Sequence, residues 1–241
     1  MLRNTIGCDG SGGPNVSLSR GATLLLNNNT ISGGYIGVGT DPGGRRTKII
    51  GPGNIIGASG DTFGAGIAPS GKVFIKDVIL HDNRRGIVSI YDFAMKLEHV
   101  TIANNDAEGI TSHFGLLGSV PGPGNAQITG RDLIVTGNGG DGIVGYGKLA
   151  LRGGTVSDNN GAGIRSHGRT FTLQGVEVSG NAEAGLVSTY AKPGRIKAAT
   201  LTGNGSGGDI AAPVPPKLVV STCEHSVDTD SGGTLGICSG D

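Results

Sequence analysis

The stretch FTLQGVEVSGNAEAGL (171–186) decides the fold, because similar stretches recur along the chain. LALRGGTVSDNNGAGI (149–164) and MKLEHVTIANNDAEGI (95–110) also end in Gly followed by a large aliphatic residue. The recurring aliphatic residues are Ile67, Ile87, Ile110, Ile143, Ile164, Leu186 and, in a weaker copy, Ile210. Their separations are 20, 23, 33, 21, 22 and 24 residues, and such a period with one outlier is typical of a solenoid.

Apolar and polar residues alternate within each unit with the period of a β-strand. In the unit at 171–186 the apolar residues are Phe171, Leu173, Val176 and Val178. The intervening polar residues are Thr172, Gln174 and Glu177. Gly and β-branched residues recur too often for helices. Each unit therefore predicts three short strands, stacked about 4.8 Å from the next unit in parallel sheets that wind as a β-helix with an apolar interior.

An Asn precedes each Gly-Ile signature at the same turn. The members of this column are Asn83, Asn105, Asn138, Asn159, Asn181 and Asn204. An Asn side chain tolerates a left-handed backbone and can hydrogen-bond to its neighbours on adjacent coils. The column predicts an internal ladder that determines the fold and binds no ligand.

Composition agrees with a solenoid and excludes several classes of protein. The chain has 241 residues, of which 48 are Gly, and the Gly clusters alternate with Val/Ile/Leu-rich segments, which indicates turns and not disorder. The 19 basic and 19 acidic residues cancel, so no overall field attracts nucleic acid or an anionic membrane. No apolar run is long enough for a membrane span, and Met1 to Ser11 contains no signal-peptide core. We expect a secreted or periplasmic protein whose leader lies outside this sequence.

The three-strand coils, the turn Asn column and the Gly-Ile signature resemble the right-handed parallel β-helix proteins of the pectate-lyase-like superfamily, particularly the generic bacterial β-helix repeat group. The segments GCDGSGG (7–13), LLLNNNTISGG (24–34) and KIIGPGNIIG (48–57) are similar to the first coils of that group. The resemblance implies one all-β domain with an N-terminal coil at 1–30, regular coils at 31–210 and a divergent cap at 211–241. It does not specify function, since the superfamily includes polysaccharide lyases, hydrolases, epimerases, tailspikes and structural proteins.

The three cysteines fall into two groups. Cys223 and Cys238 lie in the last, divergent segment, where a solenoid needs its open end covered, and a disulfide between them would suit an exported protein. A reduced pair is the alternative. Cys8 has no obvious partner and is expected as a small buried residue of the first coil. Three prolines in AAPVPPKLVV (211–220) predict that the final strands leave the regular winding as a cap.

Outward residues at one position of successive coils form rows about 4.8 Å apart, and one row is basic. It consists of Lys76, Glu98, Arg131, Arg152, Gln174 and Lys197, with Lys96 and Arg195 one position away. The placement of Arg131 assumes a one-residue bulge. We predict that Lys76, Arg131, Arg152, Lys197 and Arg195 bind carboxylated or sulfated sugars, because Arg offers bidentate contacts to such groups. The alternative is a solvated charged face that Glu98 partly neutralises.

A second row follows the Gly-Ile signature. It consists of Ile90, His113, Tyr146, His167 and Thr189, with Arg165 beside it. The chain has only five His and four Tyr, so their gathering in one register is informative, and their titration suits proton transfer. The excess of the 33-residue interval falls in FGLLGSVPGPG (114–124), where a loop is expected to project beside the row.

These residues would suit β-elimination of a uronic acid polymer, or its C5 epimerisation. Both reactions remove the proton α to a carboxylate, so the enzyme must neutralise that carboxylate and supply a base. The predicted catalytic residues are His113, Tyr146, Arg165 and His167. In this hypothesis Arg165 or Arg152 neutralises the carboxylate, and the His and Tyr side chains serve as base and acid.

No cofactor or metal is expected. Calcium-dependent pectate lyases bind metal through clustered Asp and Glu, whereas Asp77, His99 and Asp132 align here at a bend but are too few. The sequence therefore favours a β-helix that binds an acidic polysaccharide, with lyase or epimerase activity as the leading enzymatic hypothesis. The alternative is a non-catalytic structural, adhesive or surface-associated solenoid. An enzyme would need a cleft between the 114–124 loop and the His113, Tyr146, His167 row, whereas a rod needs only a flat polar surface.

Overall fold

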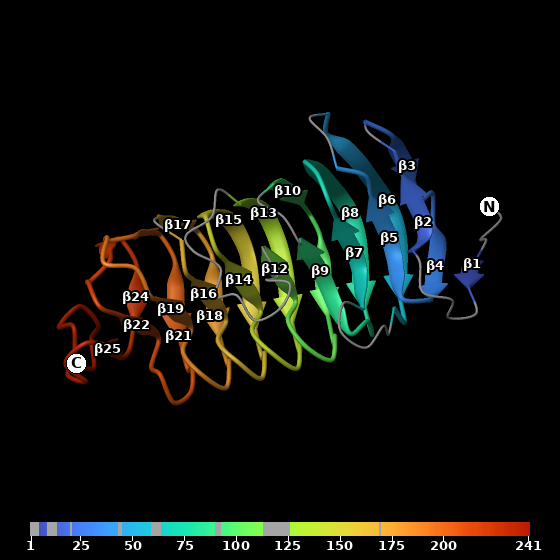
Figure 1. Ribbon diagram of the computed structural model, residues 1–241. Coiled ribbons are helices and arrows are strands. Elements are labelled where there is room, and N and C mark those ends of the chain that lie inside the picture. The colour runs from blue at the N-terminus through green and yellow to red at the C-terminus, as the bar shows by residue number, and fades with distance from the viewer. Residues whose placement is uncertain are drawn as a thin grey trace.

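A computed structural model of the chain describes residues 5–8, 14–19, 21–42, 45–58, 64–89, 93–112, 126–168 and 170–241, with only the backbone of residues 5–8. Every regular element in these ranges is a β-strand, and all strand pairs are parallel. The strands stack along one axis from the N-terminal to the C-terminal coil (Figure 1). The predicted all-β parallel β-helix is confirmed.

Each coil contributes to three lines of strands, of which the first two form a 15-stranded sheet and the third a 10-stranded sheet. The first line contains β3 (Thr23–Leu25), β10 (Ala94–Glu98), β17 (Phe171–Gln174), β20 (Arg195–Lys197) and β23 (Lys217–Val219). The second line contains β1 (Thr5–Cys8), β4 (Asn29–Gly33), β11 (Thr101–Ala103), β18 (Glu177–Ser179), β21 (Thr200–Thr202) and β24 (Thr222–Cys223). Four longer strands run through both lines: β6 (Thr47–Ile56), β8 (Val73–His81), β13 (Gln127–Thr136) and β15 (Lys148–Ser157).

The third line forms the other wall of the solenoid. Its strands are β2 (Pro14–Leu18), β5 (Ile36–Thr40), β7 (Ala65–Pro69), β9 (Arg85–Ser89), β12 (Ile110–Ser112), β14 (Ile143–Gly145), β16 (Ile164–Ser166), β19 (Leu186–Ser188), β22 (Ile210–Ala212) and β25 (Ser226–Asp228). The signature aliphatic residues lie in this line and point inward. Ile87, Ile110, Ile143 and Ile164 have no exposed surface. They share one core with the apolar residues predicted from the unit at 171–186.

A left-handed residue turns the chain between the first and second lines. We call this column the first corner, and its members are Asp77, His99, Asp132, Gly153, Gly175, Ala198 and Val220, with φ between 48° and 63°. Each member except Val220 directly follows a residue of the basic row. A single residue with positive φ therefore bends β8 and β13 without an intervening loop, which explains why these strands continue through the bend. In β15 two consecutive glycines, Gly153 and Gly154, have positive φ at the same place.

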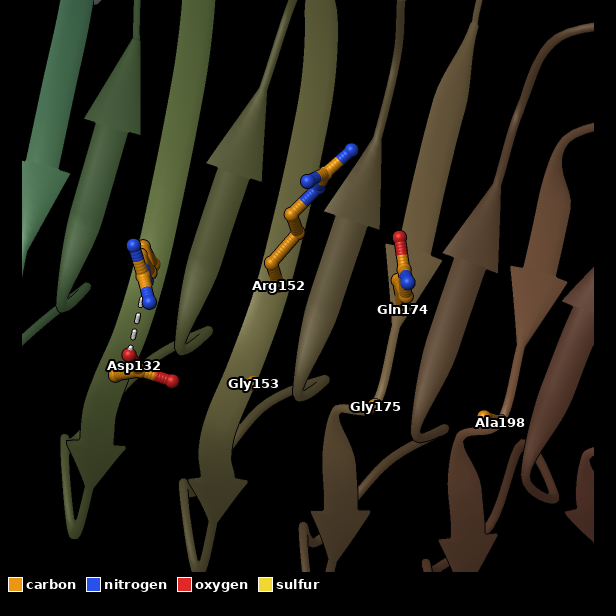
Figure 2. A pocket seen from close by; sticks show the side chains of 7 residues that line it. Asp132, Arg152, Gly153, Gln174, Gly175 and Ala198 are labelled. Atoms are coloured by element: carbon orange, nitrogen blue, oxygen red, sulfur yellow. Dashed lines mark hydrogen bonds and ion pairs between the residues drawn. The ribbon is translucent and has the colours of Figure 1, made fainter.

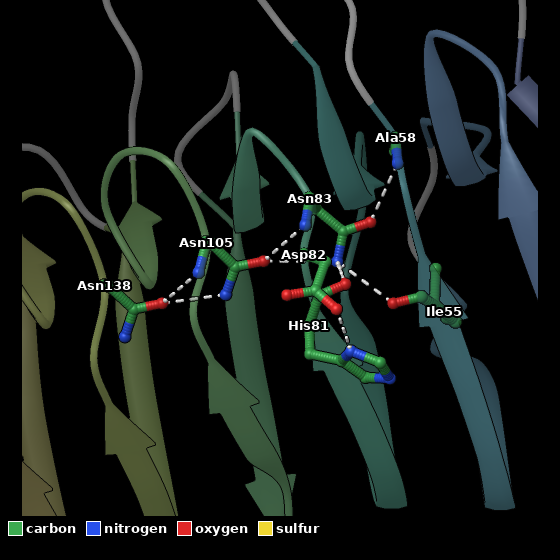
Figure 3. Close-up of polar contacts among 7 residues, drawn as sticks. All are labelled: Ile55, Ala58, His81, Asp82, Asn83, Asn105 and Asn138. Carbon is green, nitrogen blue, oxygen red and sulfur yellow. Dashed lines mark hydrogen bonds and ion pairs between the residues drawn. The ribbon is translucent and has the colours of Figure 1, made fainter.

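The Asn column lies at the second corner, between the second and third lines, and it forms the predicted ladder (Figure 3). Each side-chain amide donates from Nδ2 to Oδ1 of the next Asn toward the C-terminus, at 2.8 to 3.2 Å. Asn83, Asn105, Asn138, Asn159 and Asn181 are at most 2% exposed. The expected backbone conformation was wrong, because the left-handed residue is the one before each Asn, such as Asp82, Asn104 and Gly137.

Asp209 ends the ladder. It occupies the signature Gly position of the last copy, and its Oδ1 accepts the Asn204 amide at 2.8 Å. Its Oδ2 accepts the backbone N–H of Glu224 at 2.6 Å. At earlier copies this position needs Gly, because a Cβ on Gly109 would lie 2.6 Å from the carbonyl oxygen of Gly142 on the next coil.

The winding does not stop at the prolines of 211–220. β23, β24 and β25 pair in register with β20, β21 and β22, so the expectation that the strands leave the winding here was wrong. The residues after β25 return to the last coil, where Cys238 forms a disulfide with Cys223. Asp241 Oδ1 accepts the backbone N–H of Ser226 at 2.6 Å. The side chain of Cys8 lies outside the described residues.

Candidate functional site

The basic row lies on the outer face of the first line. Strand register aligns Lys76 with Glu98, Glu98 with Arg131, and onward to Lys197. The bulge assumed for Arg131 is absent, because residues on both sides of it pair 21 positions from their partners in β15. Arg195 lies two residues before Lys197 in β20 and aligns with Lys217. The sheet therefore brings the predicted binding residues onto one face.

A hollow of about 430 Å³ adjoins the C-terminal half of this row (Figure 2). Its lining consists of Arg131, Asp132, Arg152, Gly153, Gln174, Gly175 and Ala198. Long polar side chains from the first line border it, while the first corner supplies residues with a short side chain or none. The hollow thus follows from Gly153, Gly175 and Ala198 occupying left-handed positions directly after Arg, Gln and Lys, respectively.

Pairing of the charges changes along the row. Lys96 Nζ lies 2.8 Å from Glu98 Oε1, and this hydrogen bond lowers the pKa of Glu98. Arg131 Nε lies 3.2 Å from Asp132 Oδ2. Among the described residues, Arg152, Lys197 and Arg195 have no ion-pair partner, and all three are exposed. Free positive charge is therefore concentrated in the C-terminal half, at the hollow.

A second hollow of about 220 Å³ lies near the N-terminal end of the same corner. Its lining consists of Asn28, Thr30, Pro52, Gly53, Asn54 and Ile79. These residues supply amide, hydroxyl and apolar surface without a charge. The two hollows thus differ in the groups they could recognise.

Between the hollows lies a cluster that sequence reasoning undervalued. His99 Nδ1 is 3.1 Å from Asp77 Oδ1, and its Nε2 is 3.5 Å from Asp132 Oδ2. The signal was available, because each of these residues directly follows a member of the basic row. In the described part of the chain, no group of three or more His, Cys, Asp or Glu side chains is placed to hold a metal ion.

The second predicted row lies at the turn that follows the third line. The Tyr146 and His167 rings stack with centroids 4.6 Å apart and planes inclined by 19°. His167 Nδ1 lies 3.0 Å from the hydroxyl of Thr189 on the following coil. His113, Ile90 and the 114–124 loop lie outside the described residues, so the expected cleft beside this row stays a prediction.

Arg165 is held by carboxylates and has little capacity left for a ligand. Its Nε lies 2.6 Å from Asp141 Oδ2, and its terminal nitrogen lies 2.8 Å from Glu183 Oε2. These contacts raise the pKa of Arg165. Arg85 is paired in the same way with Glu108 at 2.5 Å. Two arginines thus share three carboxylates around the ring stack, which leaves an excess of negative charge.

Burial shifts the pKa values of His167 and Tyr146 so that both rings favour their neutral forms. Desolvation, followed by the nearby Arg165 charge, lowers the pKa of His167. Desolvation, together with the charge of Glu108, raises the pKa of Tyr146. At neutral pH this pairs a neutral imidazole with a protonated phenol, a base and an acid in contact. Arg152 belongs to the other sheet, and the charges that act on His167 are those of Arg165 and Asp141.

Comparison with known proteins concerns the fold. A family described as "Right handed beta helix region" matches residues 63–213. No curated protein matches the chain. Among solved structures, the A-module of mannuronan C-5 epimerase AlgE6 from Azotobacter vinelandii is similar, with 14% identity over 93% of this chain and 75% of that one, at a TM-score of 0.39.

No helix among the described residues could span a membrane. The parallel stacking, the three lines of strands and the internal Asn ladder agree with the matched family, whose region covers more than half of the sequence. The chain belongs to the right-handed β-helix family.

Proposed function

We propose that this β-helix binds an acidic polysaccharide along the first corner. The observation that carries the proposal is the hollow lined by Arg131 and Arg152, where the exposed Arg152 has no carboxylate partner among the described residues and Arg131 is paired with Asp132. Net charge is zero, so attraction of an anion must come from such a local group.

The geometry suits a linear polymer better than a compact ligand. Arg131, Arg152 and Gln174 lie on successive coils, and Lys197 lies on the next. Coils repeat about every 4.8 Å, so an extended chain parallel to the axis meets one polar side chain per coil. The Arg guanidinium can bind a carboxylate through two parallel hydrogen bonds, and an amide such as Gln174 can bind a sugar hydroxyl.

Binding can be tested with alginate, pectate and a glycosaminoglycan by calorimetry. We expect Arg152→Gln and Lys197→Gln each to weaken binding about tenfold, since each removes a charged hydrogen-bond donor. Lys192→Gln removes an exposed charge outside the row and should leave affinity unchanged. Affinity should also fall as salt is added. Wild-type protein that binds none of these polymers, or equal affinity in all variants, would disprove the proposal.

Lyase or C5-epimerase activity at Tyr146 and His167 is the second candidate. The stacked acid and base, with the lowered pKa of His167, favours it. The paired state of Arg165 opposes it, because a uronate carboxylate would meet a guanidinium already bound to Asp141 and Glu183. Absorbance of the unsaturated product, measured with and without calcium chelation, tests this site through His167→Gln and Tyr146→Phe. A protein that binds but forms no product would be the non-catalytic, adhesive solenoid.

The proposal also places the protein outside the cytoplasm, in the periplasm or the medium. The Cys223–Cys238 disulfide supports this location, because structural disulfides persist in oxidising compartments. Cell fractionation with an antibody against the chain would test it. Recovery in the cytoplasm with reduced cysteines would contradict it.

A further inference from the structure

We propose that the outer face of the first line docks on an anionic phospholipid bilayer. Up to the first corner, the described strands of this line carry nine cations and one carboxylate, that of Glu98. We call this surface the basic face, and its cations are Lys48, Lys76, Lys96, Arg131, Lys148, Arg152, Arg195, Lys197 and Lys217. The proposal goes beyond the polysaccharide site argued above, which is centred on a single row of this face.

Charge is strongly separated in this chain, although its net charge is zero. The basic face has nine of the 19 basic residues and one of the 19 acidic residues, a difference of +8. The rest of the chain therefore has 10 basic and 18 acidic residues, a difference of −8. Counting Asp77 and Asp132 of the first corner with the face still leaves +6 against −6. A molecule polarised in this way turns one wall toward a negative surface and the other walls away from it.

The cations form a two-dimensional array, which fits a plane better than a single polymer. Strand register places Lys48, Lys96, Arg195 and Lys217 in one row, two residues before the basic row. Rows two residues apart are separated by about 6.6 Å, and coils by about 4.8 Å. β6 and β23 are seven steps apart in the sheet order, so the array is about 34 Å long. A polymer along one row contacts part of it, whereas a layer of headgroups contacts all rows.

Most cations of the basic face are available to phosphate groups. Among the described residues, Lys76, Lys96 and Arg131 have an acidic partner. The other six are exposed and have no ion-pair partner in the described ranges, namely Lys48, Lys148, Arg152, Arg195, Lys197 and Lys217. Clusters of about 4–8 cations attach proteins to anionic lipid, because each cation near the surface strengthens binding roughly fivefold.

An exposed aliphatic side chain lies at each end of the basic face. Leu25 is 56% exposed in β3, and register through β6 places it in the row of Lys76. Val220 is 88% exposed and directly follows β23. Insertion of these side chains at the boundary of the acyl chains removes apolar surface from water. The cations thus contact the headgroups, and both ends of the face gain an anchor.

The same face is poorly suited to nucleic acid. Proteins bind single strands by stacking bases on aromatic side chains, and they read a duplex with an element that enters a groove. Phe74 is the aromatic side chain of these described rows, and Lys96 Nζ covers it at 5.1 Å from the ring centre. The described strands form a broad sheet here and not a narrow projecting ribbon. A flat anionic surface is therefore the partner that the face fits.

The proposal is tested by sedimentation with vesicles of phosphatidylcholine alone and of phosphatidylcholine mixed with phosphatidylglycerol. We expect the wild-type protein to bind the anionic vesicles alone and to be released by salt. The double variant Lys148→Gln, Lys217→Gln should weaken vesicle binding roughly 30-fold, because two cations no longer face the headgroups. Its affinity for polyuronate should stay near the wild-type value, since neither side chain lines the larger hollow.

The double variant Asn104→Asp, Asn160→Asp is the matched control. It makes the same change in net charge at exposed positions beside the Asn ladder, away from the basic face. Asp82 and Asp158 already occupy the place of Asn104 on other coils, so the fold should tolerate the change. This variant should bind anionic vesicles as tightly as the wild-type protein.

The orientation on the bilayer can be measured because the chain contains no Trp. Leu25→Trp introduces a single indole at one end of the basic face. Its emission should shift to shorter wavelength when anionic vesicles are added and should be quenched by brominated acyl chains. Asn160→Trp, at the exposed second corner, should show neither change.

Equal binding to neutral and anionic vesicles, or to neither, would overturn the proposal. Equal affinity of the two charge variants, or an indole at position 25 that stays in water, would also overturn it. A DNA duplex bound as tightly as the anionic vesicles would do the same, because the face would then hold any polyanion. Polyuronate binding without vesicle binding would leave the polysaccharide proposal standing alone, and vesicle binding without polyuronate binding would leave this one.

Discussion

The first corner and the turn after the third line both carry Arg, His and acidic side chains, yet their charges are arranged differently. At the turn, Asp141 and Glu183 on the two adjacent coils form ion pairs with Arg165. At the corner, Arg152 and Lys197 extend from the sheet beside glycines and an alanine, and no carboxylate among the described residues pairs with them. The same residue type therefore stabilises one face and remains available for binding on the other.

The largest effect should come from reversing charge at the corner. We expect the double variant Arg152→Glu, Lys197→Glu to lose more than about 100-fold in affinity for a polyuronate, because two attractive contacts become repulsive. Thermal unfolding should change little, since both side chains are exposed. Affinity would be measured by calorimetry at low salt. Unchanged affinity would show that the unpaired cations of the corner are not used for binding, contrary to the difference drawn between the two faces.

Neutralising Arg165 should have the opposite effect: it should lower stability and leave polyuronate affinity unchanged. Arg165→Met leaves Asp141 and Glu183 without their guanidinium, which we expect to lower the free energy of unfolding by about 1–3 kcal/mol. Polyuronate affinity should stay at the wild-type value. Urea denaturation and calorimetry on the same preparation would check this, and weaker binding at wild-type stability would contradict it.

The ring stack should make stability depend on pH. The pKa of folded His167 is lowered below its ordinary value of 6.5, so the unfolded chain takes up the proton more readily. Stability should be unaffected above that value and should fall as pH decreases from 6.5 through the folded pKa. A melting-temperature series compared with His167→Gln would show this, because the variant lacks that decline. Identical profiles would argue against the shift.

The smallest effect concerns the end of the corner. Val220 is β-branched, 88% exposed and left-handed at φ 50°. Val220→Gly should raise the free energy of unfolding by about 0.5–1 kcal/mol, since relief of left-handed strain outweighs the greater freedom of Gly in the unfolded chain. Denaturant melts would detect this. A destabilised variant would show that the isopropyl group makes contacts that offset the strain.

Sequence periodicity predicted the features that repeat with the coil. The offsets between Asn residues locate the ladder, and the alternation in 171–186 identifies which side chains fill the interior. The pairing state of the arginines could not be predicted in this way. Arg165 and Arg152 look equivalent in sequence, but only side-chain packing shows that Asp141 approaches the first.

The local backbone conformation also could not be predicted from the sequence pattern at several positions. The left-handed residue precedes the ladder Asn, and it is Asp82 in one coil but Gly137 in another, so residue type alone does not locate it. The prolines after Ala212 suggested an end to the winding, yet β23 follows them in register, because Lys217 to Val219 can still pair with β20.

The Asn ladder gives the solenoid a direction. Within the ladder, each Asn Nδ2 donates forward to the next Asn, and each Oδ1 accepts from the Asn of the coil before it, so a whole coil can be added or removed among them without leaving a group unmatched. Nδ2 of Asn138, Asn159 and Asn181 also donates back to a backbone carbonyl of the preceding coil. Asp209 is different, because a carboxylate can only receive, and it faces the backbone N–H of Glu224 as well as Asn204. Duplication of a coil can therefore extend the ladder before Asp209 but not after it. The number of coils, and with it the length of polymer that could be held, is adjustable from one end only.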